Sequence, residues 1–98
     1  MEKIFVIGYE NELHGAYKTL SSAIEAIIME ICNDGCEFEF ITELVENEII
    51  TQKQADLLED LDDKELYNYF LTSKAIHDYL EDNTVVLDRY FIDELPVF

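Results

Sequence analysis

Basic residues are scarce in this sequence. Six lysines and arginines stand against 23 aspartates and glutamates in 98 residues, which gives a formal net charge of −17 at pH 7. A surface this acidic repels nucleic acids and anionic membranes, because both carry negative charge themselves. The shortage of cations therefore argues against direct nucleic-acid or membrane binding, and the excess of anions predicts a basic partner.

Glycine, proline and cysteine are also scarce, with three, one and two residues. No linker, low-complexity segment or internal repeat is visible, so we expect a single domain over residues 1–98. The uncharged run Ile4–Gly8 is far too short for a signal peptide or a membrane span. Without a secretory signal, we expect Cys32 and Cys36 to be reduced and the protein to be cytoplasmic.

Hydrophobic residues make up 49% of the chain, which is enough to build a core despite the charge. Lys3–Tyr9 is short, apolar and rich in β-branched residues, so it predicts a central strand covered on both faces. Glu10–Tyr17 predicts a turn, with a short returning strand left open. Thr84–Leu95 predicts a long strand that ends at Pro96 and pairs with the first strand.

Helical periodicity dominates the segment between these strands. Ser22 and Glu25 have the spacing of a capping box ahead of an apolar stripe, and Gly35 offers a left-handed stop. The residues from Cys36 to Phe40 alternate, which leaves a short strand open, but the apolar spacing over 38–45 favours a helix.

Two further helical segments are predicted downstream. One runs from Thr51 to Leu61, and the other begins at Asp63 with an interruption near Thr72. The sequence thus predicts an α+β fold. We expect a small, mostly antiparallel sheet formed by the N- and C-terminal strands, with three to four helices between them packed on one face.

The charge is concentrated in Glu37–Glu65, where eleven carboxylates and two lysines give a net charge of −9. Residues three and four apart on a helix are neighbours, so these acids are predicted to form two stripes. The residues of the two stripes are Glu39, Glu43 and Glu46, and then Asp56, Glu59, Asp60 and Asp63. We predict that these stripes imitate the negative charge of a nucleic-acid backbone and bind a basic groove.

An aromatic anchor beside the carboxylates would strengthen such an interface, since buried aromatic side chains carry much of the binding energy of protein interfaces. Tyr67 lies close to the acidic stretch and is the candidate for this role. The alternative is that Tyr67 is a semi-buried residue at the edge of the core.

A small, very acidic domain with these two stripes resembles phage-encoded inhibitors of bacterial defence, the anti-CRISPR and anti-restriction DNA mimics. The resemblance rests on size and charge across the whole chain. It implies a noncatalytic inhibitor in the host cytoplasm that binds the nucleic-acid cleft of a Cas effector or restriction nuclease. The alternative is a small acidic regulatory or structural interaction module whose charge serves solubility, and a homodimer is left open.

Catalytic and metal-binding motifs are missing from the sequence. The four candidate zinc ligands are Cys32, Cys36, His14 and His77, but their spacing lacks the close pairs of structural zinc sites. The acids after Asp60 place no glycine at the sixth position of an EF-hand loop. There is no glycine-rich phosphate loop and no nucleophile elbow. We therefore expect no metal, no cofactor and no enzymatic activity.

Overall fold

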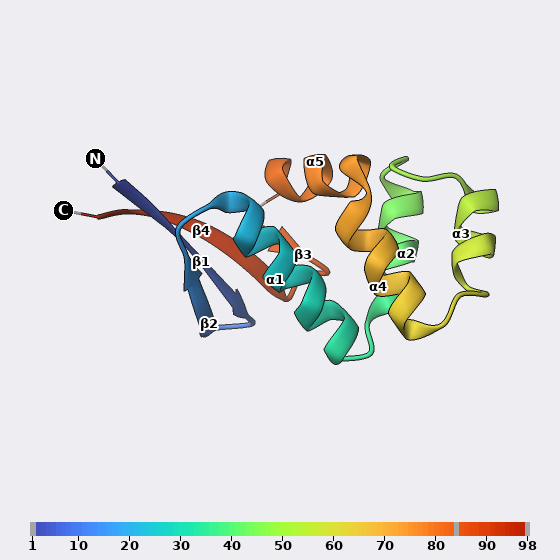
Figure 1. The fold of residues 1–98 in the computed structure, drawn as a ribbon, viewed down its shortest axis with the longest axis horizontal. Coiled ribbons are helices and arrows are strands. Elements are labelled where there is room, and N and C mark those ends of the chain that lie inside the picture. The colour runs from blue at the N-terminus through green and yellow to red at the C-terminus, as the bar shows by residue number, and fades with distance from the viewer. Residues whose placement is uncertain (1, 84, 98) are drawn as a thin grey trace.

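The computed structural model describes residues 2–83 and 85–97 and has an α+β fold, as predicted (Figure 1). In chain order its elements are β1 (Glu2–Tyr9), β2 (Glu12–Tyr17), α1 (Leu20–Asn33), α2 (Glu37–Glu46), α3 (Gln52–Leu58), α4 (Asp63–Thr72), α5 (Lys74–Asp82), β3 (Val85–Val86) and β4 (Tyr90–Val97). The helices between the terminal strands number five in this part of the chain, rather than three to four. The fifth arises because Ser73 ends α4 and caps α5 through its hydroxyl oxygen, which accepts the Ile76 N–H.

The four strands form one antiparallel sheet in the order β2-β1-β4-β3. β1 is central, as the sequence predicts, and it pairs with β4 along its whole length. The returning strand that the sequence left open is β2. Because β1 and β4 are antiparallel, the two chain ends lie at the same end of the molecule (Figure 1).

The predicted single strand Thr84–Leu95 is wrong. A turn at Leu87 and Asp88 separates β3 from β4, and both residues have positive φ angles, 56° and 55°, as in a type I′ hairpin turn. The Arg89 N–H closes this turn by donating to the Val86 carbonyl at 3.1 Å. Thr84 itself lies outside the described residues.

Pro96 lies inside β4, opposite Lys3, and does not end the strand. The short strand β3 pairs only with Tyr90 and Phe91 of β4. The far edge of β4 around Pro96 therefore has no described neighbouring strand, and a residue without an N–H costs no ladder hydrogen bond there.

The N-cap of α1 lies three residues before the predicted one. Thr19 is its N-cap, and the Thr19 hydroxyl accepts the Ser22 N–H at 3.1 Å. The predicted capping box of Ser22 and Glu25 is therefore wrong, because Thr19 already satisfies the first turn. At the other end the prediction is confirmed: Gly35 has φ of +74°, and Cys36 N–H donates back to the Ile31 carbonyl at 3.0 Å, as in a Schellman motif.

α1 also supplies the centre of the hydrophobic core. It packs on one face of the sheet, and α4 and α5 pack against it. Its buried side chains are Ala23, Ile24, Ile27, Ile28 and Ile31. Each buried isoleucine contributes roughly 1.5–3 kcal/mol, so this stripe is a main source of stability.

The molecule is elongated, with extents of 46 × 22 × 22 Å. The sheet lies at the end that holds both termini, and α2, α3 and α4 lie toward the opposite end (Figure 1). We call these the sheet end and the helical end. Most of the acidic stretch Glu37–Glu65 is thereby placed far from the chain termini.

Candidate functional site

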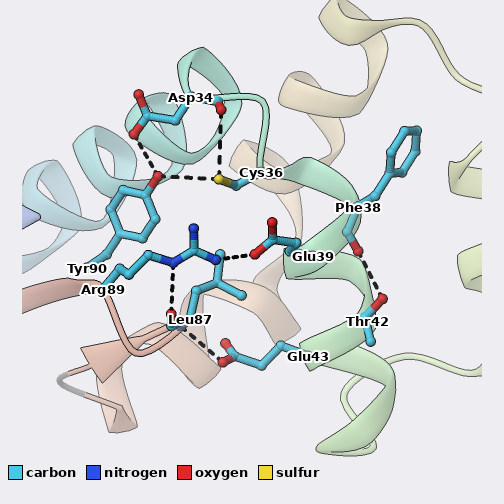
Figure 2. Close-up of polar contacts among 9 residues, drawn as sticks. All are labelled: Asp34, Cys36, Phe38, Glu39, Thr42, Glu43, Leu87, Arg89 and Tyr90. Carbon is cyan, nitrogen blue, oxygen red and sulfur yellow. Dashed lines mark hydrogen bonds and ion pairs between the residues drawn. The ribbon is translucent and has the colours of Figure 1, made fainter. Parts of the chain in front are cut away.

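Two acids of the first predicted stripe hold the β3–β4 turn (Figure 2). The Arg89 guanidinium forms an ion pair with the Glu39 carboxylate. The Leu87 N–H donates to Glu43 Oε1 at 3.1 Å. Glu39 and Glu43 therefore have structural contacts within the chain, and their binding to a partner stays a prediction.

Glu43 is the more enclosed of these two acids. Its second oxygen, Oε2, is buried and has no hydrogen-bond partner among the described residues. The pKa of the Tyr79 phenol is raised to about 12, first by burial and then by the neighbouring Glu43 carboxylate. The pKa of Arg89 is raised as well, mainly because its guanidinium donates to Glu39. Together these groups form a charged cluster between α2 and the β3–β4 turn.

The second predicted stripe does not lie on one helix. α3 ends at Leu58, one turn earlier than predicted, and Glu59 is its C-cap. The Asp62 side chain accepts the Glu65 N–H at 2.8 Å and so starts α4, of which Asp63 is the first residue. This cap competes with a longer α3, because a short acidic side chain satisfies the free N–H groups of a new helix.

The acids of the second stripe consequently lie in different surroundings. Asp56 is on α3 and accepts a hydrogen bond from Gln52 Nε2 at 3.0 Å. Asp63 lies near Cys32: the pKa of that thiol is raised to about 12, first by burial and then by the charges of Glu37 and Asp63. Asp60 is exposed in the turn between α3 and α4.

Glu46 and Glu59, one from each predicted stripe, are brought together. A cavity of about 330 Å³ is lined by Glu39, Thr42, Glu43, Glu46, Leu87, Asp88 and Arg89. A second cavity of about 230 Å³ is lined by Ile41, Thr42, Val45, Glu46, Gln52, Ala55 and Glu59. The two cavities adjoin at Thr42 and Glu46, and we call them together the acidic groove.

Tyr67 lies outside the acidic groove. It is half-buried against the core and lines a separate cavity of about 390 Å³ with Tyr17, Met29 and Leu71, among others. Tyr67 is thus semi-buried, as in the alternative, and lies away from the acidic groove, while its contact with a partner stays a prediction.

The β3–β4 turn contributes residues to the groove that the sequence did not predict. Asp88 adds a carboxylate to the groove, and Arg89 supplies its cation. Arg89 is the only arginine of the sequence, which could have marked it as a partner for the acidic stretch. Nothing local could have paired it with Glu39, which lies 50 residues away.

Metal binding finds no support in this geometry. Within residues 2–83 and 85–97, no three His, Cys, Asp or Glu side chains form a group that could hold a metal ion. Cys32 and Cys36 are free thiols rather than a disulfide. In the same part of the chain, no helix is both long and apolar enough to cross a membrane.

Comparison with protein-family models, with curated proteins and with solved structures finds no match to this chain. We therefore infer the function from the geometry and charge of the molecule.

Proposed function

We propose that this protein is a noncatalytic inhibitor that docks its acidic helical end into the basic nucleic-acid-binding cleft of another protein. The partner class that fits best is a nuclease of bacterial defence, a Cas effector or restriction enzyme. The bound carboxylates take the place of nucleic-acid phosphates, so the partner loses access to its substrate.

The supporting observation is the uneven distribution of charge. Residues 37–72, which form α2, α3 and α4 at the helical end, hold 11 acidic and two basic residues, a net charge of −9, whereas the other 62 residues together carry 12 acidic and four basic residues, a net charge of −8. In the described chain only one of those 11 acids, Glu39, lies within 4.0 Å of a lysine or arginine nitrogen. The negative charge of these helices is thus almost unneutralised by basic side chains of the same chain.

The acidic groove is a concave part of this negative surface that a partner side chain can enter. Glu46 lies where its two cavities meet, and Glu59 faces it from the end of α3. A lysine or arginine side chain of the partner can enter the groove and bind both carboxylates, since Arg–carboxylate pairs form charge-assisted hydrogen bonds. Exposed Asp56 and Asp60 extend the negative surface beyond the groove. Attraction between such surfaces speeds association and weakens as salt is added.

Two variants of equal charge test the proposal. The helical-end variant carries Glu46→Gln, Glu59→Gln and Asp60→Asn. The sheet-end variant carries Glu10→Gln, Glu12→Gln and Glu94→Gln. Each removes three of the negative charges and has a net charge of −14, so that they differ only in where the charge is lost.

The experiment is affinity capture from a bacterial lysate at low and high salt, followed by a nucleic-acid competition assay on each captured protein. We expect the unaltered protein and the sheet-end variant to retain basic nucleic-acid-binding proteins, which elute with salt and lose their nucleic acid when the inhibitor is added. The helical-end variant should lose most of this capture. Equal capture by both variants, or capture only of proteins that bind no nucleic acid, contradicts the proposal.

The engagement of Glu39 and Glu43 within the chain favours a second candidate function. Acids that stabilise their own fold need no cationic partner, and the remaining charge would then serve only to keep a small interaction module in solution. In that case charge removal at either end leaves partner binding unchanged, whereas changes to exposed apolar residues abolish it.

A further inference from the structure

The outer face of the sheet, opposite α1, is apolar. An antiparallel sheet with one face on the core ordinarily places polar residues on its solvent face. Here the strand register aligns Leu13, Gly8, Phe91 and Val85 in one row across all four strands. The next rows on this face are Ala16, Val6 and Asp93, and then Ile4 and Leu95. We call this set the sheet patch, and Asp93 is its one charged residue.

Two local features build the patch. The register of β2 shifts by one residue between Ile7 and Gly8 of β1, which leaves His14 as an extra residue and returns Leu13 to the outer face. His14 instead contacts Glu30 of α1 through its Nδ1 at 2.6 Å. Gly8 has no side chain, and the Phe91 ring occupies the space where a Cβ would lie.

The patch is open to solvent at its edges, where Leu13 is 69% exposed, Val85 53% and Leu95 47%, whereas Val6 and Gly8 at its centre are buried. The neighbouring residues that face the core, Tyr90 and Ile92, are buried. Exposed apolar residues gathered on one face mark an interaction surface, whereas scattered ones need no explanation.

The charge distribution indicates which partner fits. A cationic protein is drawn to the helical end, because that end carries most of the charge and the sheet patch carries almost none. Two copies of this chain repel each other least when they meet at their sheet ends, since their helical ends then point apart. The self-repulsion of a −17 molecule therefore leaves the sheet patch as the favoured place for contact with a second copy.

We infer that the protein self-associates through the sheet patch, with two sheets packed face to face about 10 Å apart. The patch extends about 14 Å along the strands and about 14 Å across them, from the usual spacings of residues and strands. The patch thus covers about 200 Å², well below the roughly 800 Å² that each partner buries in a stable interface. The dimer is accordingly weak and forms only at high protein concentration.

Sedimentation equilibrium of the whole chain, from low micromolar to millimolar concentration, tests the inference. We expect a monomer–dimer equilibrium that tightens as salt is added, because salt screens the repulsion between copies. This is opposite in sign to the salt effect expected for binding a basic partner. The result is thus independent of whether the proposed inhibitory function is correct.

Matched variants locate the interface. Leu13→Asp and Leu95→Asp each place a charge in the sheet patch and should weaken the dimer at least about tenfold. Leu57→Asp is the control, because Leu57 is 64% exposed on α3, far from the sheet. Circular dichroism verifies that each variant is folded. A monomer at millimolar concentration in high salt, or equal weakening by Leu57→Asp, overturns the inference.

Discussion

Glu43 and Glu46 lie on the same helix, one turn apart, yet their surroundings differ sharply. Glu43 accepts the Leu87 N–H and has a buried second oxygen, whereas Glu46 is exposed at the junction of the two cavities of the groove. The Leu87 N–H belongs to a turn whose two central residues have positive φ, a conformation that costs about 1–2 kcal/mol for residues other than glycine. At the scale of single residues, Glu43 stabilises the fold and Glu46 is free for binding.

We predict that Glu43→Ala lowers the free energy of unfolding by about 1–3 kcal/mol, because it leaves the Leu87 N–H without its acceptor. Glu46→Ala should change it by less than about 0.5 kcal/mol, as is usual at exposed sites. Urea unfolding followed by circular dichroism measures both. Equal effects of the two substitutions would show that the hydrogen bond from the Leu87 N–H to Glu43 does not stabilise the fold.

Stability should also fall at alkaline pH. The pKa values of Cys32 and Tyr79 are raised to about 12 from ordinary values of 9.0 and 10.0. Both groups are neutral when protonated, and only the unfolded chain loses these protons readily. Their contribution is therefore constant below about pH 9 and is lost as the pH rises from about 9 to about 12.

Urea unfolding between pH 7 and pH 11 measures this loss. In a Cys36→Ala background, the Cys32 thiol of the folded protein should react with a disulfide reagent at pH 8 about 100 to 1,000 times more slowly than a free thiol, because the thiolate is the reactive form. Rapid reaction in the folded state, or stability that is level up to pH 11, contradicts this prediction.

At the scale of elements, α3 depends most on its own cap. It has seven residues, too few for a stable helix in isolation, and it carries Glu59 at its end. The Thr51 hydroxyl accepts the Gln54 N–H at 3.1 Å, and the Gln54 side chain accepts the Thr51 N–H at 2.8 Å. This capping box fixes where α3 begins and so positions one wall of the acidic groove.

Thr51→Ala should therefore destabilise the protein by about 1 kcal/mol. Thr42→Ala is the matched control, since the Thr42 hydroxyl donates to the Phe38 carbonyl within α2 and caps nothing. Thermal unfolding compares the two variants. If Thr51→Ala and Thr42→Ala lower the thermal unfolding midpoint by the same amount, the capping box does not stabilise α3.

The sequence predicted those elements whose signals are local. The isoleucine stripe of α1, the stop at Gly35 and the apolar strand Lys3–Tyr9 each depend on residues that are close in the chain, and all three were correct. The β3–β4 turn has no glycine or asparagine at Leu87 and Asp88, so it reads as continuous strand. It is held from outside by Glu43, 44 residues away from Leu87.

The candidate site was predictable to the same degree. Its overall charge follows from composition alone, but which acids are free depends on distant contacts. Arg89 engages Glu39 across 50 residues. The second stripe is divided by a local contact instead, the cap that Asp62 forms with the Glu65 N–H. The exposed groove acids, Glu46 and Glu59, could be identified only once the helices had been placed.

At the scale of the whole molecule, self-repulsion within the helical end opposes folding. Most of its 11 acids have no lysine or arginine nitrogen within 4.0 Å in the described chain, so screening should relieve the repulsion. We predict that raising NaCl from about 0.01 M to about 0.5 M increases the free energy of unfolding by about 1 kcal/mol or more. The helical-end variant should show a smaller increase than the unaltered protein. Stability that falls with salt would show instead that attractive ion pairs dominate.

The central claim is that the position of the charge, and not its total, makes the helical end a binding surface. The most direct test is the affinity of the two −14 variants for a captured basic protein, measured by calorimetry across a range of NaCl concentrations. We predict that the helical-end variant binds at least about tenfold more weakly than the sheet-end variant at low salt, and that the difference shrinks as salt rises. Equal affinities at every salt concentration would contradict the claim.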